Sequence, residues 1–180
     1  MQLRSSFFGW QVDVTKLEKV PKSVIIQAPH TSNWDFFVGI IAAKKSKIPF
    51  RFIIKDAWNI PIIGRILLNL GAIFINRSKS SGLTQRIAEA AKKMNHGHFI
   101  FTPEGTRSKV SKWKSGFYHI AHNAHIPIAI GYIDYKHKKI GIHDVFYPSG
   151  NINADMAQYR NFFNSIQPKH SKNYNPNWEI

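Results

Sequence analysis

Residues 24–35 read VIIQAPHTSNWD and carry an apolar run directly into a polar turn. The run from Val24 to Ala28 has the length and composition of a strand that is buried on both faces of a sheet. Beyond Pro29 and the turn, apolar residues recur at helical spacing, at Phe36, Phe37, Ile40 and Ile41. A buried strand followed by a helix predicts the first unit of an α/β fold.

The turn itself holds a candidate catalytic pair. His30 stands where the strand ends, and a carboxylate at Asp35 that reached one ring nitrogen would orient the imidazole as a general base. Residues five apart on one helix point about 140° apart, so the two side chains meet only if His30 lies before the helix. Ser32 and Asp35 also fit the Ser-x-x-acidic pattern of a helix N-terminus, which explains Asp35 without catalysis. Both interpretations stay open at this point.

The alternation of strand and helix continues along the chain. Further strands are expected at 50–54, 71–77, 98–102 and 126–133, and helices at 62–70, 82–95, 115–123 and 155–166. A hairpin is expected to join 126–133 to 140–145, and 10–14 gives a weak strand signal. We therefore predict one α/β domain over residues 1–180, with a mixed, mostly parallel sheet flanked by helices. Residues from about 167 to 180 are expected to form a loosely held tail.

The helix expected at 62–70 carries an apolar stripe made of Ile62, Ile63, Ile66, Leu67 and Leu70. A face buried in the core is the ordinary explanation of such a stripe, and a wall for an acyl chain or a membrane-docking face is the less common one. No apolar run free of charge approaches the ~18 residues that a membrane span needs, and the N-terminus does not resemble a secretory signal. Any contact with a membrane is therefore expected at its surface.

Polar residues follow several of the expected strands at the same end. His30, Arg77 and the Glu104–Arg107 segment all lie just beyond the carboxyl end of a strand. In open α/β sheets, ligands gather at that edge. One site can therefore contain all three groups, and its two arginines suit an anionic phosphate.

Composition limits the chemistry further. The 180 residues include 25 Lys and Arg against 10 Asp and Glu, a formal charge of +15, so an anionic partner is expected. Nucleic acid, an acidic membrane surface and a phosphorylated substrate all meet that description. The absence of cysteine excludes disulfides, thiolate metal sites and a cysteine nucleophile. The sequence also lacks the glycine-rich and serine motifs of NTPases, dinucleotide-binding proteins and serine hydrolases.

Two other patterns favour alternatives less strongly. His119, His122 and His125 are spaced by three residues, but with no acidic residue nearby they indicate a polar stripe rather than a metal site. Trp113 and Tyr135 stand among lysines, which suits a nucleic-acid-binding module but forms no known motif.

Taken together, these residues resemble the glycerophospholipid acyltransferase family, in particular small bacterial proteins similar to lysophosphatidic acid acyltransferase. The resemblance covers about residues 24–133. The first family motif, His-x-x-x-x-Asp, matches His30 and Asp35, and the second, a strand ending in arginine, matches Gly71, Phe74 and Arg77. The third motif matches Pro103 to Ser108, with Thr102 in place of the usual phenylalanine. The fourth corresponds to 126–128, with Ile130 where a second proline is usual.

The resemblance implies an O-acyltransferase of phospholipid biosynthesis. His30 would take the proton of an acceptor hydroxyl, which attacks the thioester of an acyl-CoA or acyl-carrier protein, while Asp35 orients the imidazole. The residues implied for the phosphate of a lysophospholipid acceptor are Arg77, Glu104, Gly105, Thr106 and Arg107, with Asn76 and Ser108 as additional candidates. Neither a metal nor another cofactor is implied.

The expected location is the cytosolic face of an anionic membrane, with the protein in the cytoplasm and peripheral to the bilayer. The positive charge supports that location, and Phe7, Phe8, Trp10 and the stripe at 62–70 are candidates for insertion. Two alternatives remain from the sequence: a basic nucleic-acid-binding module and a non-catalytic protein that binds anionic lipid.

Overall fold

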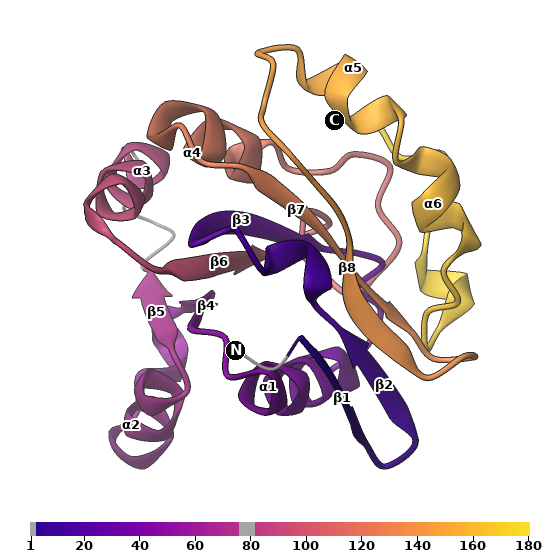
Figure 1. Cartoon of the computed structure of the whole chain (residues 1–180), viewed down its shortest axis with the longest axis horizontal. Helices are drawn as coiled ribbons and strands as arrows, with labels where there is room; N and C mark the ends of the chain where they lie inside the picture. The colour runs from indigo at the N-terminus through magenta and orange to yellow at the C-terminus, as the bar shows by residue number, and fades with distance from the viewer. Residues whose placement is uncertain (1–2, 76–81) are drawn as a thin grey trace.

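The computed structural model describes residues 3–75 and 82–180. Eight strands form one sheet in the order β1-β2-β8-β7-β3-β6-β4-β5, with helices on both faces (Figure 1). The strands are β1 (Arg4–Phe7), β2 (Trp10–Asp13), β3 (Lys22–Gln27), β4 (Phe50–Lys55), β5 (Ala72–Ile75), β6 (Gly97–Phe101), β7 (Ile128–Asp134) and β8 (Lys139–Phe146). The helices are α1 (Trp34–Ser46), α2 (Pro61–Asn69), α3 (Leu83–Lys93), α4 (Gly116–Ala124), α5 (Ile152–Ala157) and α6 (Arg160–Ser165), with short 3-10 turns η1 (Thr15–Leu17), η2 (Asp56–Trp58) and η4 (Ser171–Asn173).

The central strands are parallel. Strand β3 pairs in parallel with both β6 and β7, and β4 pairs in parallel with β6 and β5. The expected hairpin forms between β7 and β8, which pair antiparallel. The mixed, mostly parallel α/β sheet predicted from the alternation of patterns is therefore confirmed. Because β3 lies between β6 and β7, their carboxyl ends meet beside the turn that holds His30.

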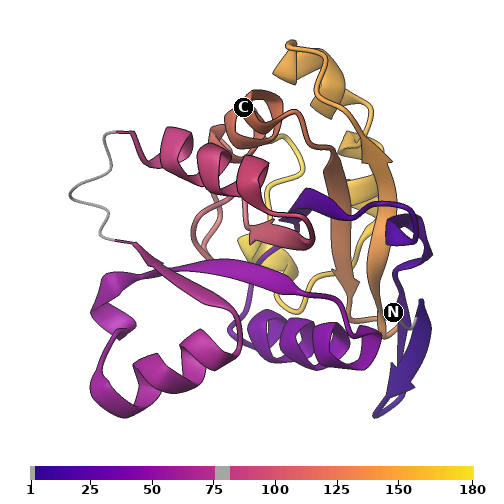
Figure 2. The same cartoon turned by 60° about the vertical axis from the view of Figure 1, so that its left-hand side comes forward.

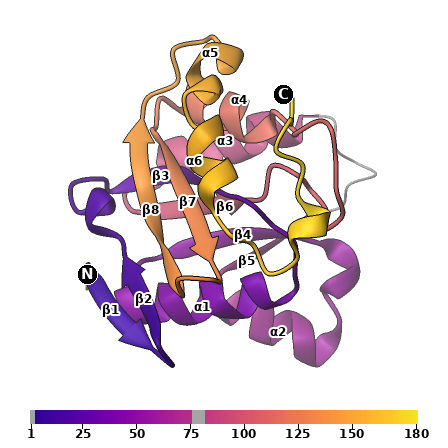
Figure 3. The ribbon, with the colours of Figure 1, turned by 90° about the vertical axis from the view of Figure 1, so that its right-hand side faces the viewer.

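Alternating residues of β3 separate the core into two layers. Val24 and Ile26 face a cluster formed with α3, α4 and the C-terminal helices, whereas Ile25 faces a cluster formed with α1. All three are at most 2% exposed. Figure 3 shows α1 on one side of the sheet and α4 to α6 on the other. Both faces of β3 are covered, which explains its uninterrupted apolar run.

The segment expected as one helix at 155–166 forms two short helices, α5 and α6. Tyr159 stands between them, 4% exposed, and its hydroxyl donates to Asp144 of β8 at 2.7 Å. The helix is therefore interrupted at the residue that docks on the sheet.

The expectation of a loosely held tail at 167–180 is wrong. Trp178 is 1% exposed and stacks on Trp113 with ring centroids 4.0 Å apart. On either side of this stack, the Trp113 amide donates to Glu179 O at 2.7 Å and the Glu179 amide donates to Ser111 O at 2.8 Å. The asparagines, prolines and lysines suggested mobility, but one buried indole fixes the segment to the core.

The ordinary explanation of the stripe at 62–70 is also wrong for most of its residues. In α2 only Gly64 and Leu67 are buried, whereas Ile62 is 77% exposed. No helix in residues 3–75 and 82–180 is both long and apolar enough to cross a membrane.

Candidate active site

The turn between β3 and α1 brings His30 and Asp35 together. His30 Nδ1 lies 2.9 Å from Asp35 Oδ2, because the histidine precedes the helix and the aspartate is in its first turn. The His30 side chain is 17% exposed and that of Asp35 is 4% exposed. The histidine therefore remains accessible to a substrate, while the carboxylate behind it is shielded from water.

Asp35 is held by hydrogen bonds to both of its oxygens. The amides of Thr31 and Ser32 donate to Oδ2 at 3.0 and 3.1 Å, and the Tyr135 hydroxyl donates to Oδ1 at 2.7 Å. Burial raises the pKa of the Asp35 carboxyl, but the hydrogen bonds from His30, Tyr135 and Ser32 outweigh it, and the pKa lies below its usual value. An ionised Asp35 only accepts, so Nδ1 of His30 carries the shared proton and Nε2 is left to accept another.

The helix-capping interpretation of Asp35 holds in part, because the helix begins one residue later than the pattern predicts, with Asn33 as its N-cap. The Asp35 carboxylate accepts from the Ser32 amide, which is one half of a capping box. The other half is altered, because the Ser32 hydroxyl accepts from the amide of Trp34 at 3.2 Å. One carboxylate therefore both shapes the turn and contacts the histidine.

Glu104 occupies a different place from the one expected. It is only 6% exposed, and its Oε1 accepts a hydrogen bond of 2.8 Å from the backbone amide of His30. Burial raises the pKa of Glu104 to about 8, and the nearby charge of Asp35 adds to the effect, so the side chain is mostly neutral at pH 7. Its Oε2 has no hydrogen-bond partner within the described residues. Glu104 thus joins the loop after β6 to the loop after β3 instead of projecting into solvent.

The remaining residues of this loop lie nearer the surface. Gly105 has φ +66°, and a Cβ added to it would stand 2.8 Å from Lys114 Nζ. The left-handed backbone favours glycine here, whereas the flexible end of the lysine could move away from a Cβ. Thr106, Arg107 and Ser108 are exposed, with the Thr106 hydroxyl accepting from the Ser108 amide at 3.3 Å. Their cationic and hydroxyl groups are free to meet a solute. Asn76 and Arg77 lie outside the described residues.

Tyr135 is a site residue that the motif analysis missed. It directly follows β7, so the rule that placed His30 and Glu104 at the carboxyl edge of the sheet applies to it equally. Burial and the hydrogen bond to Asp35 raise the pKa of the Tyr135 hydroxyl far above its usual value, which keeps it a donor. Its partner Asp35 lies 100 positions away, so no local spacing indicates the contact.

The C-terminal segment also reaches this site. The Tyr135 amide donates to Gln167 O at 2.9 Å, and the His170 amide donates to the Thr31 hydroxyl at 3.2 Å. Between these contacts, Lys169 Nζ lies 4.7 Å from the ring centre of Trp34. The C-terminal segment therefore borders the turn of His30, as the loops after β6 and β7 also do.

Comparison with known proteins gives a consistent family. A family model described as Acyltransferase matches residues 11–131. A probable 1-acyl-sn-glycerol-3-phosphate acyltransferase of Mycoplasma pneumoniae is 30% identical over 131 residues, covering 67% of this chain and 48% of the relative. A 1-acyl-sn-glycerol-3-phosphate acyltransferase of Borreliella burgdorferi is 31% identical over 105 residues, covering 56% of this chain and 41% of the relative. The chain thus spans about half the length of the curated relatives it matches.

The fold has a counterpart among solved structures. The crystal structure of the 1-acyl-sn-glycerophosphate acyltransferase PlsC from Thermotoga maritima superposes with a TM-score of 0.57 at 21% identity. The match covers 85% of this chain and 66% of that one. At this level of identity the likeness concerns the fold.

Proposed function

This chain belongs to the glycerophospholipid acyltransferase family, and we propose that it transfers an acyl group from an acyl thioester to the hydroxyl of a lysophospholipid. Lysophosphatidic acid is the favoured acceptor, in keeping with the names of the relatives from Mycoplasma pneumoniae and Borreliella burgdorferi. The donor is an acyl-CoA or an acyl-carrier protein. Because the donor is itself a substrate, the proposal includes no cofactor.

The observation that carries the proposal is the contact of 2.9 Å between His30 Nδ1 and Asp35 Oδ2. His30 Nε2 takes the proton of the acceptor hydroxyl as its oxygen attacks the thioester carbonyl carbon. The tetrahedral intermediate then expels the thiolate, which receives the proton back from the imidazolium. Asp35 stays ionised throughout and stabilises the imidazolium, which is the role of the aspartate in a catalytic triad.

The acceptor phosphate meets cationic groups at the edge of this site. Arg107 is exposed in the loop after β6, and Lys114 lies against Gly105 of the same loop. An arginine binds phosphate through paired N–H donors, and a lysine adds a point charge. Glu104 is better suited to holding the His30 backbone than to contacting an anion, given its burial and its hydrogen bond.

The proposed location is the cytosolic surface of an anionic membrane. The formal charge of +15 supports it, because each well-placed basic residue contributes about 1 kcal/mol of attraction to such a surface. The nucleic-acid alternative is less favoured, since Trp113 is 2% exposed and has no face available for stacking on a base.

The test is the release of free thiol from acyl-CoA in the presence of lysophosphatidic acid. The variants are His30→Ala and Asp35→Asn, with His119→Ala as the control because His119 is an exposed histidine on α4. General base catalysis contributes about 10²–10⁴-fold, so the His30 variant is expected to lose at least about a hundredfold in kcat. The control should keep the wild-type rate. Equal activity of His30→Ala and wild type would exclude the mechanism, and turnover by wild type only with acyl-carrier protein would identify the donor.

A further inference from the structure

The exposed apolar side chains of this protein are concentrated at one edge. Among the described residues, ten large apolar side chains are exposed, and nine of them belong to three segments: the turn between β1 and β2, helix α1, and the stretch 58–68 that runs from η2 into α2. These nine, which we call the apolar face, are Phe8, Trp34, Phe37, Trp58, Ile60, Ile62, Ile63, Ile66 and Leu68. The tenth is Tyr147, which follows β8.

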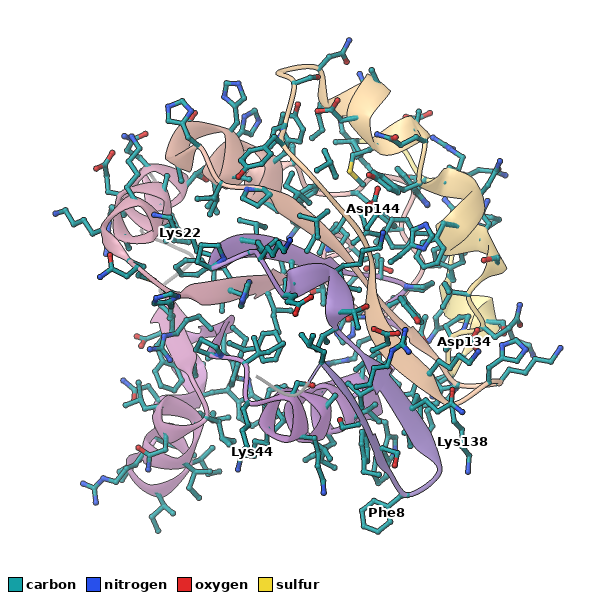
Figure 4. All side chains as sticks on the ribbon, viewed as in Figure 1. Phe8, Lys22, Lys44, Asp134, Lys138 and Asp144 are labelled. Atoms are coloured by element: carbon teal, nitrogen blue, oxygen red, sulfur yellow. The ribbon has the colours of Figure 1, made fainter. Side chains whose placement is uncertain are left out.

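The three segments line the lower edge of the molecule. The turn between β1 and β2 lies at one end of this edge, helix α2 at the other, and helix α1 between them (Figures 1, 2 and 3). Figure 4 shows the side chain of Phe8 pointing away from the protein at this edge. Phe8 is 89% exposed at the tip of the hairpin. Isolated exposed apolar residues are ordinary, but a group of nine along one edge marks a surface that meets another body.

Helix α2 contributes most of this surface. Ile62, Ile66 and Leu68 are 77%, 54% and 53% exposed, while Leu67 packs toward the sheet at 8%. The helix is held close to the preceding turn at Gly64, where an added Cβ would stand 2.7 Å from the Asn59 side chain. Helix α2 thus turns Gly64 and Leu67 inward and leaves its three isoleucines exposed.

Most charges around the apolar face are positive, and the exception is Asp56, which is exposed in the same short turn, η2, as Trp58. Lys44, Lys45 and Lys47 are exposed at the end of α1, and Arg65 is exposed on α2. None of the four forms an ion pair with another described residue. The only acidic residue within α1 and α2 is Asp35, which is buried. An apolar surface bordered by unpaired cations fits anionic headgroups above acyl chains, and exposed Trp34 and Trp58 suit the interface between them.

The apolar face is continuous with the candidate active site. Trp34 is 57% exposed and directly precedes Asp35 in the first turn of α1. Lys169 lies over the Trp34 ring, which adds a cation at the border between the face and the His30 turn. A lipid acceptor whose headgroup lay in a surface at this face would have a short path to His30.

We propose that the apolar face docks on an anionic lipid bilayer, with α2 and the first turn of α1 lying in the headgroup region. The benefit to catalysis rests on the proposed function, because the bilayer would supply the lysophospholipid acceptor. Docking itself involves no turnover and is measured separately. The hydrophobic contact supplies affinity, and the lysines and arginine supply a salt-dependent part.

The experiment measures co-sedimentation with vesicles of phosphatidylcholine containing 30 mol% phosphatidylglycerol. The test protein is the double variant Ile62→Glu/Ile66→Glu, and the matched control is Tyr147→Glu, which places a charge at the exposed apolar residue outside the face. Because all three positions are exposed, the thermal unfolding midpoints should stay near that of wild type. The double variant is expected to lose about tenfold or more in vesicle partitioning, and the control is expected to bind like wild type.

A second readout uses the intrinsic tryptophans. Trp34 and Trp58 are exposed, whereas Trp113 and Trp178 are buried, so lipids brominated near the headgroup should quench part of the fluorescence. Trp58→Phe should reduce that quenching. Equal partitioning of the double variant and wild type would overturn the proposal. Failure of wild type to bind vesicles would also overturn it. If wild type instead forms a dimer that the double variant does not form, the apolar face is a dimer interface and the proposal is again overturned.

Activity separates this proposal from the one on which it rests. With a short-chain lysophospholipid below its micelle concentration, the double variant should release thiol at the wild-type rate. With the acceptor embedded in vesicles, its rate should fall about as much as its partitioning. If no variant shows turnover while vesicle binding behaves as expected, the proposed function fails and the docking face stands.

Discussion

Replacing Glu104 with glutamine tests the protonation of the side chain that supports the His30 turn. Glutamine keeps an Oε1 acceptor for the His30 amide but cannot ionise. In the wild type the folded protein holds the Glu104 proton up to a pKa of about 8, whereas an ordinary glutamate releases it near 4.5. The folded state therefore binds more protons than the unfolded state between these two values, and wild-type stability falls as pH rises through them.

The size of the effect follows from the pKa difference. At about 1.4 kcal/mol per pKa unit, a shift from 4.5 to about 8 corresponds to at most about 5 kcal/mol. Since Glu104 is 6% exposed, solvent screening reduces this energy little. Local relaxation around the charged side chain reduces it further. We expect the free energy of unfolding of Glu104→Gln, relative to that of wild type, to be constant below pH 4.5 and to rise by at least about 2 kcal/mol by pH 8.5.

Urea unfolding followed by tryptophan fluorescence at several pH values measures this difference. Subtracting the wild-type free energy of unfolding from that of the variant cancels the other titrating groups. Glu18→Gln is the control, because it makes the same substitution at an exposed position. A Glu104→Gln difference that rises with pH no more than that of the control would refute the assignment of a neutral, buried Glu104.

Two further predictions concern Tyr135 and Trp178. Tyr135→Phe removes a hydrogen bond of 2.7 Å to Asp35, and kcat should fall about tenfold with KM unchanged, for a cost of about 1.4 kcal/mol. An unchanged kcat, or a change in KM alone, would contradict a positioning role. Trp178→Ala should lower the free energy of unfolding by about 3–5 kcal/mol through loss of the stack on Trp113. Trp58→Ala, at an exposed tryptophan, should change it by less than about 0.5 kcal/mol, and equal losses would show that the C-terminal segment is not docked as described.

The parts of the fold that the sequence predicted depend on local patterns. The run from Val24 to Ala28 predicts a buried strand, because a strand covered on both faces needs apolar residues at every position. Pro29 directly after the run predicts the turn. The spacing of five positions showed that His30 must precede the helix in order to meet Asp35, but only the folded turn shows that the two side chains touch. Interactions between residues close in sequence can be inferred from the spacing of those residues.

The errors arose where long-range packing decides the outcome. Nothing in the stripe at 62–70 tells which side of α2 faces the sheet, and a helix that exposes its isoleucines has the same periodicity as one that buries them. The prediction of a loose tail was wrong because it rested on the many asparagines and lysines, whereas the packing of Trp178 on Trp113 holds the segment in place. Likewise, the roles of Glu104 and Tyr135 depend on strands that pair only in the folded sheet.

The turn after β3 presents consecutive backbone amides to carboxylates. The His30 amide donates to Glu104, and those of Thr31 and Ser32 donate to Asp35. Loop amides generally exchange their hydrogens with solvent quickly, whereas these should exchange only when the turn opens. The His30 amide is protected by the contact with the β6 loop, and the amides of Thr31 and Ser32 are protected by the contact with Asp35. Their separate deuterium uptake shows which of these contacts opens more often. Amide hydrogen exchange can therefore measure, without any substrate, how often this turn leaves the geometry that brings His30 to Asp35.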